Sequence, residues 1–204
     1  MDNSPLHDPV PFDEVSGLLL AADVGVNSMA ALDGELLERI FKELGELDTA
    51  QQLGERTVTH KERIAEWLWD ESRGIFANRM ISGEFVSTLA PTSFFPMAAG
   101  IGSKDQSQRM IQGYLNHPSK FGGEFCLPSV TRDDPTYTDN VYWRGRIWSP
   151  LNFWVWQGLK RQGFIKESEK LAEQSWELFK KNWKQRLCGE NFNAETGEVL
   201  DQPD

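Results

Sequence analysis

The sequence predicts an all-α domain built of antiparallel helix pairs, with one small β-hairpin. Apolar residues recur at helical spacing in several long stretches of the 204-residue chain, whereas segments typical of strands are short and confined to one place. Irregular loops separate the stretches, as expected where helices pack in pairs. With 39% hydrophobic and 25% charged residues, the composition is that of a folded globular protein with its own core.

Local signals mark each expected element. The stretch from Asp33 to Gly45, DGELLERIFKELG, has apolar residues three and four positions apart, with Asp33 as the N-cap and Gly45 at the stop. A second helix is expected over 49–69, and two short strands are expected to pair around Ser82–Gly83. Further helices are expected over 91–100, 103–117, 147–163 and 166–187. Gly189 follows the last of these, and its tolerance of positive φ is expected to end that helix.

The charge pattern limits the classes of partner. The chain has a net charge of −10, and its Lys and Arg residues are interspersed with acidic ones. A nucleic-acid partner is therefore not expected, whereas neutral or cationic ligands remain open. No run approaches about eighteen apolar residues, so no membrane partner is expected and the chain is expected to be soluble. Cys126 and Cys188 show neither a disulfide framework nor metal-ligand spacing, so two buried thiols are expected and the compartment stays undecided, with the cytoplasm slightly favoured.

Three loops concentrate the unusual residues of the chain. They are MDNSPLHD at 1–8, RDDPTYTDNVYWRGRIW at 132–148 and CGENFNAETGE at 188–198. The middle one ends a loop of more than twenty residues, and a loop of that length in a compact domain is usually functional or disordered. Its aromatic content argues against disorder. If the three loops meet at one end of a helical toroid, carboxylates of the first and third face each other across a cleft lined by Tyr, Trp and Arg.

That layout is typical of a sugar site. Cleaving a glycosidic bond needs one acid to protonate the leaving oxygen and a second carboxylate on the other face of the ring. Aromatic rings pack on the C–H faces of a sugar, and Arg, Asn and Asp bond its hydroxyls. The residue types alone leave plainer alternatives open. An Asp before Asn-Ser-Pro is most often a turn or cap residue, and the composition around Glu190 is hardly stronger evidence for a catalytic role. Trp154 and Trp156, at helical spacing, are more often core residues than sugar contacts.

The segment YWRGRIWSPLNFWVWQGLKRQGF, 142–164, closely resembles the signature of glycoside hydrolase family 63 and its mannosylglycerate hydrolase-like relatives. Further blocks are similar to that family in the family's order: MDNSPLHD, ADVGVNSMAALD, LWDESRGIFANR, LAPTSFFPMAAG, LPSVTRDDPTY and ENFNAETGE. The resemblance therefore covers nearly the whole chain, and the combination of blocks is specific.

The resemblance implies part of an (α/α)6 barrel, a six-hairpin toroid, that carries an inverting α-glycosidase site. Matched onto this sequence, the general acid is Asp2 and the general base is Glu190, the latter from the Glu-Asn-Phe-Asn segment. The implied sugar contacts are Trp143, Arg144, Tyr142, Asp133, Tyr137 and Asn3. The implied chemistry removes a terminal α-glucosyl or α-mannosyl residue from a carbohydrate substrate and requires neither a metal nor an organic cofactor.

The length of the chain leaves alternatives open. Twelve helices closing a barrel need on the order of 350 residues at ordinary helix and loop lengths, so residues 1–204 are expected to be the C-terminal portion of a single catalytic domain. The rival hypothesis is a non-catalytic, helical carbohydrate-binding or scaffold remnant, because Asp2 on a frayed terminus is poorly held. Among enzymes, trehalase-like, mannosylglycerate or glucosylglycerate hydrolase and oligosaccharide glucosidase activities all remain open, as does the oligomeric state.

Overall fold

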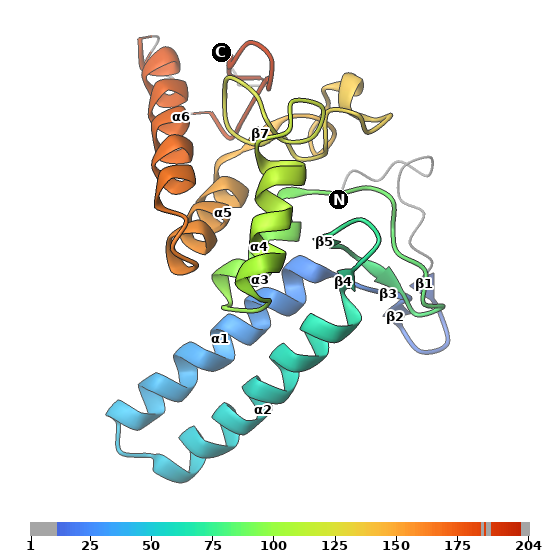
Figure 1. Ribbon diagram of the computed structural model, residues 1–204, viewed down its shortest axis with the longest axis vertical. Helices are drawn as coiled ribbons and strands as arrows, with labels where there is room; N and C mark the ends of the chain where they lie inside the picture. Colours follow the sequence, from blue (N-terminus) through green and yellow to red (C-terminus); the bar gives the residue numbers. More distant parts are fainter. Residues whose placement is uncertain (1–11, 185, 187–188, 201–204) are drawn as a thin grey trace.

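The computed structural model describes residues 12–184, 186 and 189–200, and its longest elements are helices that pair in antiparallel fashion (Figure 1). The α-helices are α1 (Val24–Glu43), α2 (Leu47–Trp67), α3 (Phe95–Ala98), α4 (Lys104–Met110), α5 (Ser149–Arg161) and α6 (Ile165–Trp183). Short turns of other helical types are η1 (Pro91–Phe94), η2 (Ile111–Leu115) and η3 (Tyr137–Asp139). The α1/α2 pair projects from the rest of the molecule, and α5 and α6 pair on the other side of α3 and α4.

The strands in the described part of the chain are two residues long and pair in antiparallel twos. They are β1 (Phe12–Asp13), β2 (Leu18–Leu19), β3 (Ala21–Ala22), β4 (Trp69–Asp70), β5 (Ile75–Phe76), β6 (Arg79–Met80), β7 (Ile147–Trp148) and β8 (Asn191–Phe192). The pairs are β1–β2, β3–β6, β4–β5 and β7–β8. Since β3 and β6, and likewise β7 and β8, are far apart in sequence, these short pairs fasten loops of distant segments together.

Helix α1 begins at Val24, well before the expected start at Asp33. Asp23 is the N-cap, and its carboxylate accepts a hydrogen bond of 2.8 Å from the Val26 amide. The first turns contain Gly25 and Ser28, which disguise the helix in the sequence. Both fit the structure, because a Cβ at Gly25 would lie 2.9 Å from Thr92 and the buried Ser28 hydroxyl bonds the carbonyl four residues before it. The expected stop is confirmed, with Gly45 at φ +81°.

The expected pairing around Ser82–Gly83 is confirmed only as one antiparallel bridge, Arg79 with Phe85, on either side of a turn. The tight hairpin is β4–β5, and its turn is organised by Asp70, whose carboxylate accepts hydrogen bonds of 2.7 Å from the Ser72 hydroxyl and 3.1 Å from the Arg73 amide. Around Ser82–Gly83 a single bridge remains, and β6 pairs instead with β3. The segment therefore makes two turns, one organised by the Asp70 side chain and one at Gly83, whose amide bonds the Met80 carbonyl at 2.8 Å.

The core lies where α1, α3 and α5 meet. Phe94, Met97, Val155 and Leu159 are buried there, and Gly158 allows α5 to approach α3 so closely that a Cβ would lie 2.9 Å from the Ala98 nitrogen. The other expected helices are confirmed with small shifts in their ends. Trp154 and Trp156 pack partly buried against the core, as their spacing indicated.

The buried thiol is confirmed at Cys126, where burial raises the pKa of the thiol, and Cys188 lies outside the described residues. Within the described ranges, no helix combines the length and the apolar character needed to cross a membrane.

Candidate active site

Glu190 stands at the start of a tightly closed loop, residues 189–200. Within the loop, the Asn193 amide bonds the Glu198 carbonyl and the Gly197 amide bonds the Asn193 carbonyl, both at 2.8 Å. Asn182 of α6 anchors the loop from outside: its buried side-chain amide donates to the Gly197 carbonyl at 2.8 Å and accepts from the Val199 amide at 3.1 Å. The loop that carries Glu190 is therefore held to the end of α6 by side-chain hydrogen bonds.

The expected role of Gly189 as a helix stop with positive φ is wrong. Helix α6 ends at Trp183, and the φ of Gly189 lies outside the left-handed region. Glycine is needed here because of close packing: a Cβ at this position would lie 2.7 Å from Val199 Cγ2. The two ends of the loop, at Gly189 and Val199, are therefore in contact next to Glu190.

Strands β7 and β8 join the Glu190 loop to the middle loop. Trp148 pairs with Asn191, and Ile147 pairs with Phe192. Two of the three loops that the sequence expected at one end of the molecule therefore meet. Glu190 itself is exposed, so its carboxylate is open to water. The first loop, with Asp2 and Asn3, lies outside the described residues.

Three aromatic rings gather beside this strand pair. Trp143 and Trp148 stack with centroids 3.8 Å apart and planes inclined by 16°, and the Tyr142 ring meets both edge-on at 5.6 and 4.9 Å. The Trp148 indole nitrogen donates to the Tyr142 carbonyl at 2.9 Å. Trp148 is buried, Trp143 is half-buried and Tyr142 is exposed, so the cluster has a closed side and an open side.

A tight turn presents the open side of this cluster. Val141 and Arg144 exchange backbone hydrogen bonds of 3.1 and 2.8 Å, with Tyr142 between them at φ +46°. Gly145 follows at φ +91°, and a Cβ there would lie 2.2 Å from the Tyr137 carbonyl oxygen. Arg144 faces Asp139, with Nε 3.5 Å from Oδ2. Packing against the backbone of Tyr137 thus sets the direction of the turn and of its two aromatic residues.

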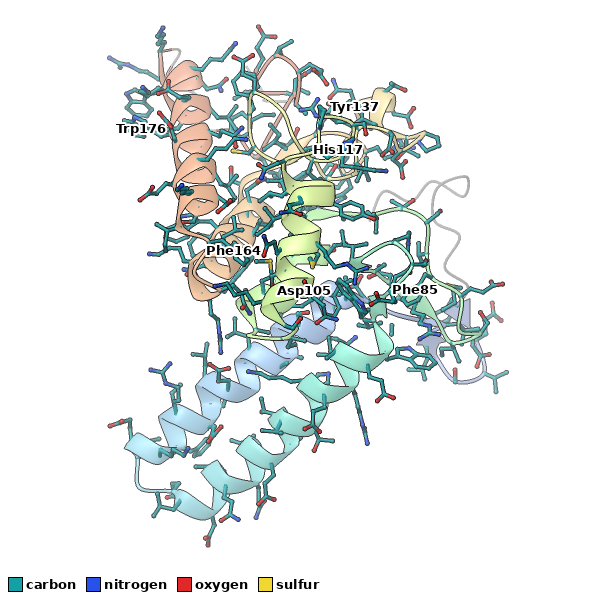
Figure 2. The ribbon with its side chains drawn as sticks, viewed as in Figure 1. Phe85, Asp105, His117, Tyr137, Phe164 and Trp176 are labelled. Carbon is teal, nitrogen blue, oxygen red and sulfur yellow. The ribbon has the colours of Figure 1, made fainter. Side chains whose placement is uncertain are left out.

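Tyr137 ties the middle loop to the Glu190 loop a second time. Its hydroxyl donates to the Glu195 carboxylate, to which Arg132 also donates. Two causes raise the pKa of Tyr137 above its ordinary value: burial is the larger, and the hydrogen bond to Glu195 is the next. Figure 2 shows Tyr137 among the loops at the end of the molecule farthest from the tip of the α1/α2 pair. The hydroxyl of this expected sugar contact is thus engaged in joining the two loops.

Asp133 has a different neighbour from the other expected site residues. Its carboxylate accepts a hydrogen bond from Lys120, and its amide donates to the Ser119 carbonyl at 3.0 Å. Burial favours the protonated form, but the bond and the charge of Lys120 outweigh it, so the pKa of Asp133 lies below its ordinary value. The structure pairs Asp133 with Lys120, not with the Glu190 loop.

One buried residue near the Glu190 loop, Arg146, was not identified from the sequence. Arg146 is buried with 6% of its surface exposed, and its Nη1 donates to Asn191 Oδ1 at 2.9 Å while Nε donates to the Asn140 carbonyl at 2.8 Å. The sequence signal that could have identified Arg146 was a positively charged residue next to Ile147, in a segment whose other residues predict burial. The family signature leaves this position variable, so the resemblance did not single it out.

A pocket of about 340 Å³ lies between the two loops. Its lining comprises Tyr137, Thr138, Asn140, Gly145, Asn193, Ala194 and Glu195. Most of the surface that lines it is apolar, with a few polar groups among it, as is usual for small-molecule sites. In the described part of the chain, no three His, Cys, Asp or Glu side chains converge as metal ligands would.

Comparisons with known proteins place the chain among glycoside hydrolases. The mannosylglycerate hydrolase MGH1-like glycoside hydrolase domain matches residues 8–204. The chain is 26% identical over 181 residues to the mannosylglycerate hydrolase of Rubrobacter radiotolerans, which covers 84% of this chain and 38% of that protein. It is 34% identical over 118 residues to the cytosolic neutral trehalase of Kluyveromyces lactis, which covers 55% of this chain and 15% of that protein.

Two solved structures have the same arrangement of helices. The family 63 mannosylglycerate hydrolase from Thermus thermophilus, in complex with glucose, has a TM-score of 0.74 at 22% identity over 88% of this chain and 43% of that chain. Neutral trehalase Nth1 from Saccharomyces cerevisiae has a TM-score of 0.72 at 20% identity over 93% of this chain and 37% of that chain. The chain spans less than half the length of these relatives.

The structural likenesses confirm the expected fold, an all-α chain that forms part of an (α/α)6 barrel with small paired strands. The family match includes both the Trp143 motif and the Glu190 loop, which the structure joins through β7 and β8. The resemblance to glycoside hydrolase family 63 is likewise confirmed. The chain belongs to the family of mannosylglycerate hydrolase MGH1-like glycoside hydrolase domains.

Proposed function

We propose that the protein is an inverting, exo-acting α-glycosidase in which Glu190 is the general base and Asp2 the general acid. One observation carries the proposal. An exposed glutamate starts a loop that is closed by its own hydrogen bonds, and the strand that follows it pairs with the strand of Trp148 in an aromatic cluster. A carboxylate held beside aromatic rings is the combination that sugar hydrolysis needs.

In the proposed reaction, Glu190 takes a proton from a water molecule as that water attacks the anomeric carbon. Asp2 gives a proton to the leaving oxygen on the other side of the bond. Inversion requires room for the water, so the two carboxyl groups should stand about 6.5–9.5 Å apart. The solvent exposure of Glu190 suits a base whose partner is water.

The sugar is proposed to pack against Tyr142 and Trp143, with Arg144 near its hydroxyls. Asn3, Tyr137 and Asp133 complete the proposed set of contacts. Of these, Tyr137 and Asp133 already bond Glu195 and Lys120, so their contribution is weaker unless these pairs open. The proposed substrates are small α-glucosides and α-mannosides. Family relatives are named as trehalases and as mannosylglycerate hydrolases, so trehalose and α-mannosylglycerate are the first substrates to assay.

The test compares two carboxylates of one loop. Glu190→Gln is expected to lower kcat by about 10²–10⁴-fold with little change in folding, which is the usual contribution of a general base. Glu198→Gln removes an exposed carboxylate from the same loop and is the matched control. Asp2→Asn should also abolish turnover, least for substrates with good leaving groups. Proton NMR should show the β-anomer as the first product, and retained activity in Glu190→Gln would remove Glu190 from the mechanism.

The second candidate is carbohydrate binding without hydrolysis. The aromatic cluster and the pocket of about 340 Å³ favour it, because neither needs a carboxylate to hold a sugar. Quenching of tryptophan fluorescence by a sugar, without release of product over hours, would support binding alone. Product release that depends on Glu190 would support the enzyme.

A further inference from the structure

Arg146 places a buried cation one residue away from the proposed base. Its guanidinium donates to Asn191 Oδ1 at 2.9 Å, and Asn191 directly follows Glu190 in the chain. Asn191 is itself buried, with 3% of its surface exposed. Arg146 is buried and does not line the pocket between the two loops, so we consider the residues that it holds.

Burial of a guanidinium needs an explanation. Removing a charge from water costs several kcal/mol unless hydrogen bonds compensate, and an apolar side chain of similar size often gives an equally stable fold. Arg146 has only 6% of its surface exposed, so its charge is held almost entirely out of water. What the guanidinium adds is direction, because its planar fork fixes several acceptors at set angles.

Two acceptors of Arg146 lie on the two segments that must be aligned in the proposed site. Nη1 holds Asn191 of the Glu190 loop, and Nε holds the carbonyl of Asn140 at 2.8 Å. Asn140 has φ +48° and leads into the turn that presents Tyr142 and Trp143. One side chain therefore bonds the segment of the base and the segment of the aromatic platform.

Other contacts fix the remaining freedom of Asn191. Its backbone pairs with Trp148 across β7 and β8, and its carbonyl accepts a hydrogen bond of 3.3 Å from the Leu200 amide. The bond from Arg146 to Asn191 Oδ1 adds a side-chain contact to this backbone pairing, directly beside Glu190. An error of about 1 Å in the position of a catalytic group costs roughly 10²-fold in rate. Loss of the bond between Arg146 and Asn191 is therefore expected to lower the rate of catalysis.

We propose that Arg146 is a positioning residue that fixes Glu190 relative to the Tyr142–Trp143 turn through its bonds to Asn191 and Asn140. This inference rests on the proposed role of Glu190 as the base. It predicts an effect on kcat rather than on sugar binding, because the aromatic rings stay stacked on Trp148 without the guanidinium.

The kinetic test uses Arg146→Met, Arg146→Lys and Asn191→Leu. We expect Arg146→Met to lower kcat by about 10²-fold while KM changes by less than about threefold. Arg146→Lys should recover part of the loss, because an ammonium can still bond one of the two acceptors. Asn191→Leu should lower kcat in the same direction, and the double variant should be no slower than Arg146→Met, because Arg146→Met already lacks the bond to Asn191.

Arg161→Met is the matched control. Arg161 bonds Glu35 and the Ala98 carbonyl at the opposite end of α5 from β7. It should lower the melting temperature and leave kcat unchanged. A kcat loss in Arg146→Met no greater than that in Arg161→Met would overturn the positioning role.

Hydrogen exchange gives a readout that does not depend on turnover. In Arg146→Met, the amides of 189–193 should exchange at least about tenfold faster, while those of 195–199, a stretch that Asn182 bonds at Gly197 and Val199, should not change. Equal exchange over 189–193 in both proteins would overturn the proposal, whatever the activity. If Glu190→Gln keeps full activity while Arg146→Met loosens 189–193, the role of Glu190 as base fails and the clamp on Asn191 stands.

Discussion

Trp143 and Trp148 stack with their ring centroids 3.8 Å apart, although they come from opposite sides of the Gly145 turn. Trp148 is buried and hydrogen-bonded, whereas Trp143 is half-buried. The buried ring therefore supports the other ring, which keeps one orientation without being enclosed. A ring held in this way can contact a sugar without losing side-chain freedom on binding.

Trp143→Ala should weaken sugar binding by about tenfold, because stacking on a fixed ring is worth roughly 1 kcal/mol beyond the area it buries. Trp143→Phe should recover part of that loss. Isothermal titration with the product sugar measures both. Trp176→Ala is the control, because Trp176 projects from the outer side of α6 (Figure 2) and is 55% exposed. Equal affinities of Trp143→Ala and the parent protein would contradict the proposed platform.

Gly189→Ala should disturb the Glu190 loop by overpacking. The added methyl would lie 2.7 Å from Val199 Cγ2, and overpacking of this kind costs about 1–3 kcal/mol. Urea unfolding should show the loss of stability, and activity should fall with it. Shortening the opposing side chain relieves the clash, so Val199→Ala in the same protein should restore most of both. Failure of that second substitution to restore stability would point to a backbone requirement at Gly189 instead.

Stability should decrease in alkali because of Tyr137. Burial and the hydrogen bond to Glu195 raise the pKa of Tyr137, so the folded protein holds the phenol proton more tightly than the unfolded chain. This contribution is complete below the unfolded pKa of about 10 and is lost as pH rises above it.

Urea unfolding between pH 8 and pH 11 measures the effect. Tyr137→Phe should flatten the decline above about pH 10. Burial also raises the pKa of Tyr114, so Tyr114→Phe should flatten the decline further. A parent protein and a Tyr137→Phe variant with the same alkaline slope would exclude this linkage.

Stability should decrease in acid because of Asp70. Burial favours the protonated form, but hydrogen bonds from Ser72 and Arg73 outweigh it and hold the pKa of Asp70 below its ordinary value. The stabilisation is present above the unfolded pKa of about 3.9 and is lost as pH falls through the folded value. Asp70→Asn should cost about 2 kcal/mol at pH 7, the range for a hydrogen bond to a charged group.

Chemical denaturation between pH 7 and pH 2 tests this second linkage. The acid slope should be shallower in Asp70→Asn than in the parent protein. Ser72→Ala removes one bond to the carboxylate, at 2.7 Å, and should have a smaller effect in the same direction. An Asp70→Asn variant as stable as the parent protein at pH 7 would contradict the role of this side chain in the β4–β5 turn.

The helices followed from the sequence because their apolar spacing is a local property. Gly45 ends α1 as expected, since a left-handed residue needs no partner elsewhere in the chain. The start of α1 was missed because contacts with distant residues decide it: Gly25 is set by Thr92, and the Val24 amide bonds Asn78. The β4–β5 hairpin was missed because two turns lie close together in this segment, and the one with longer paired strands depends on side-chain bonds to Asp70.

The sequence by itself determined the class of fold, the family and the residue types of the site. Spacing, composition and ordered motifs are carried by neighbouring residues and survive without coordinates. The tertiary structure decided which of these residues meet. Pairing of β7 with β8 joins Trp148 to Asn191, and Arg146 bonds both loops from within. Contacts between residues far apart in sequence depend on how the whole chain packs, and no local pattern encodes them.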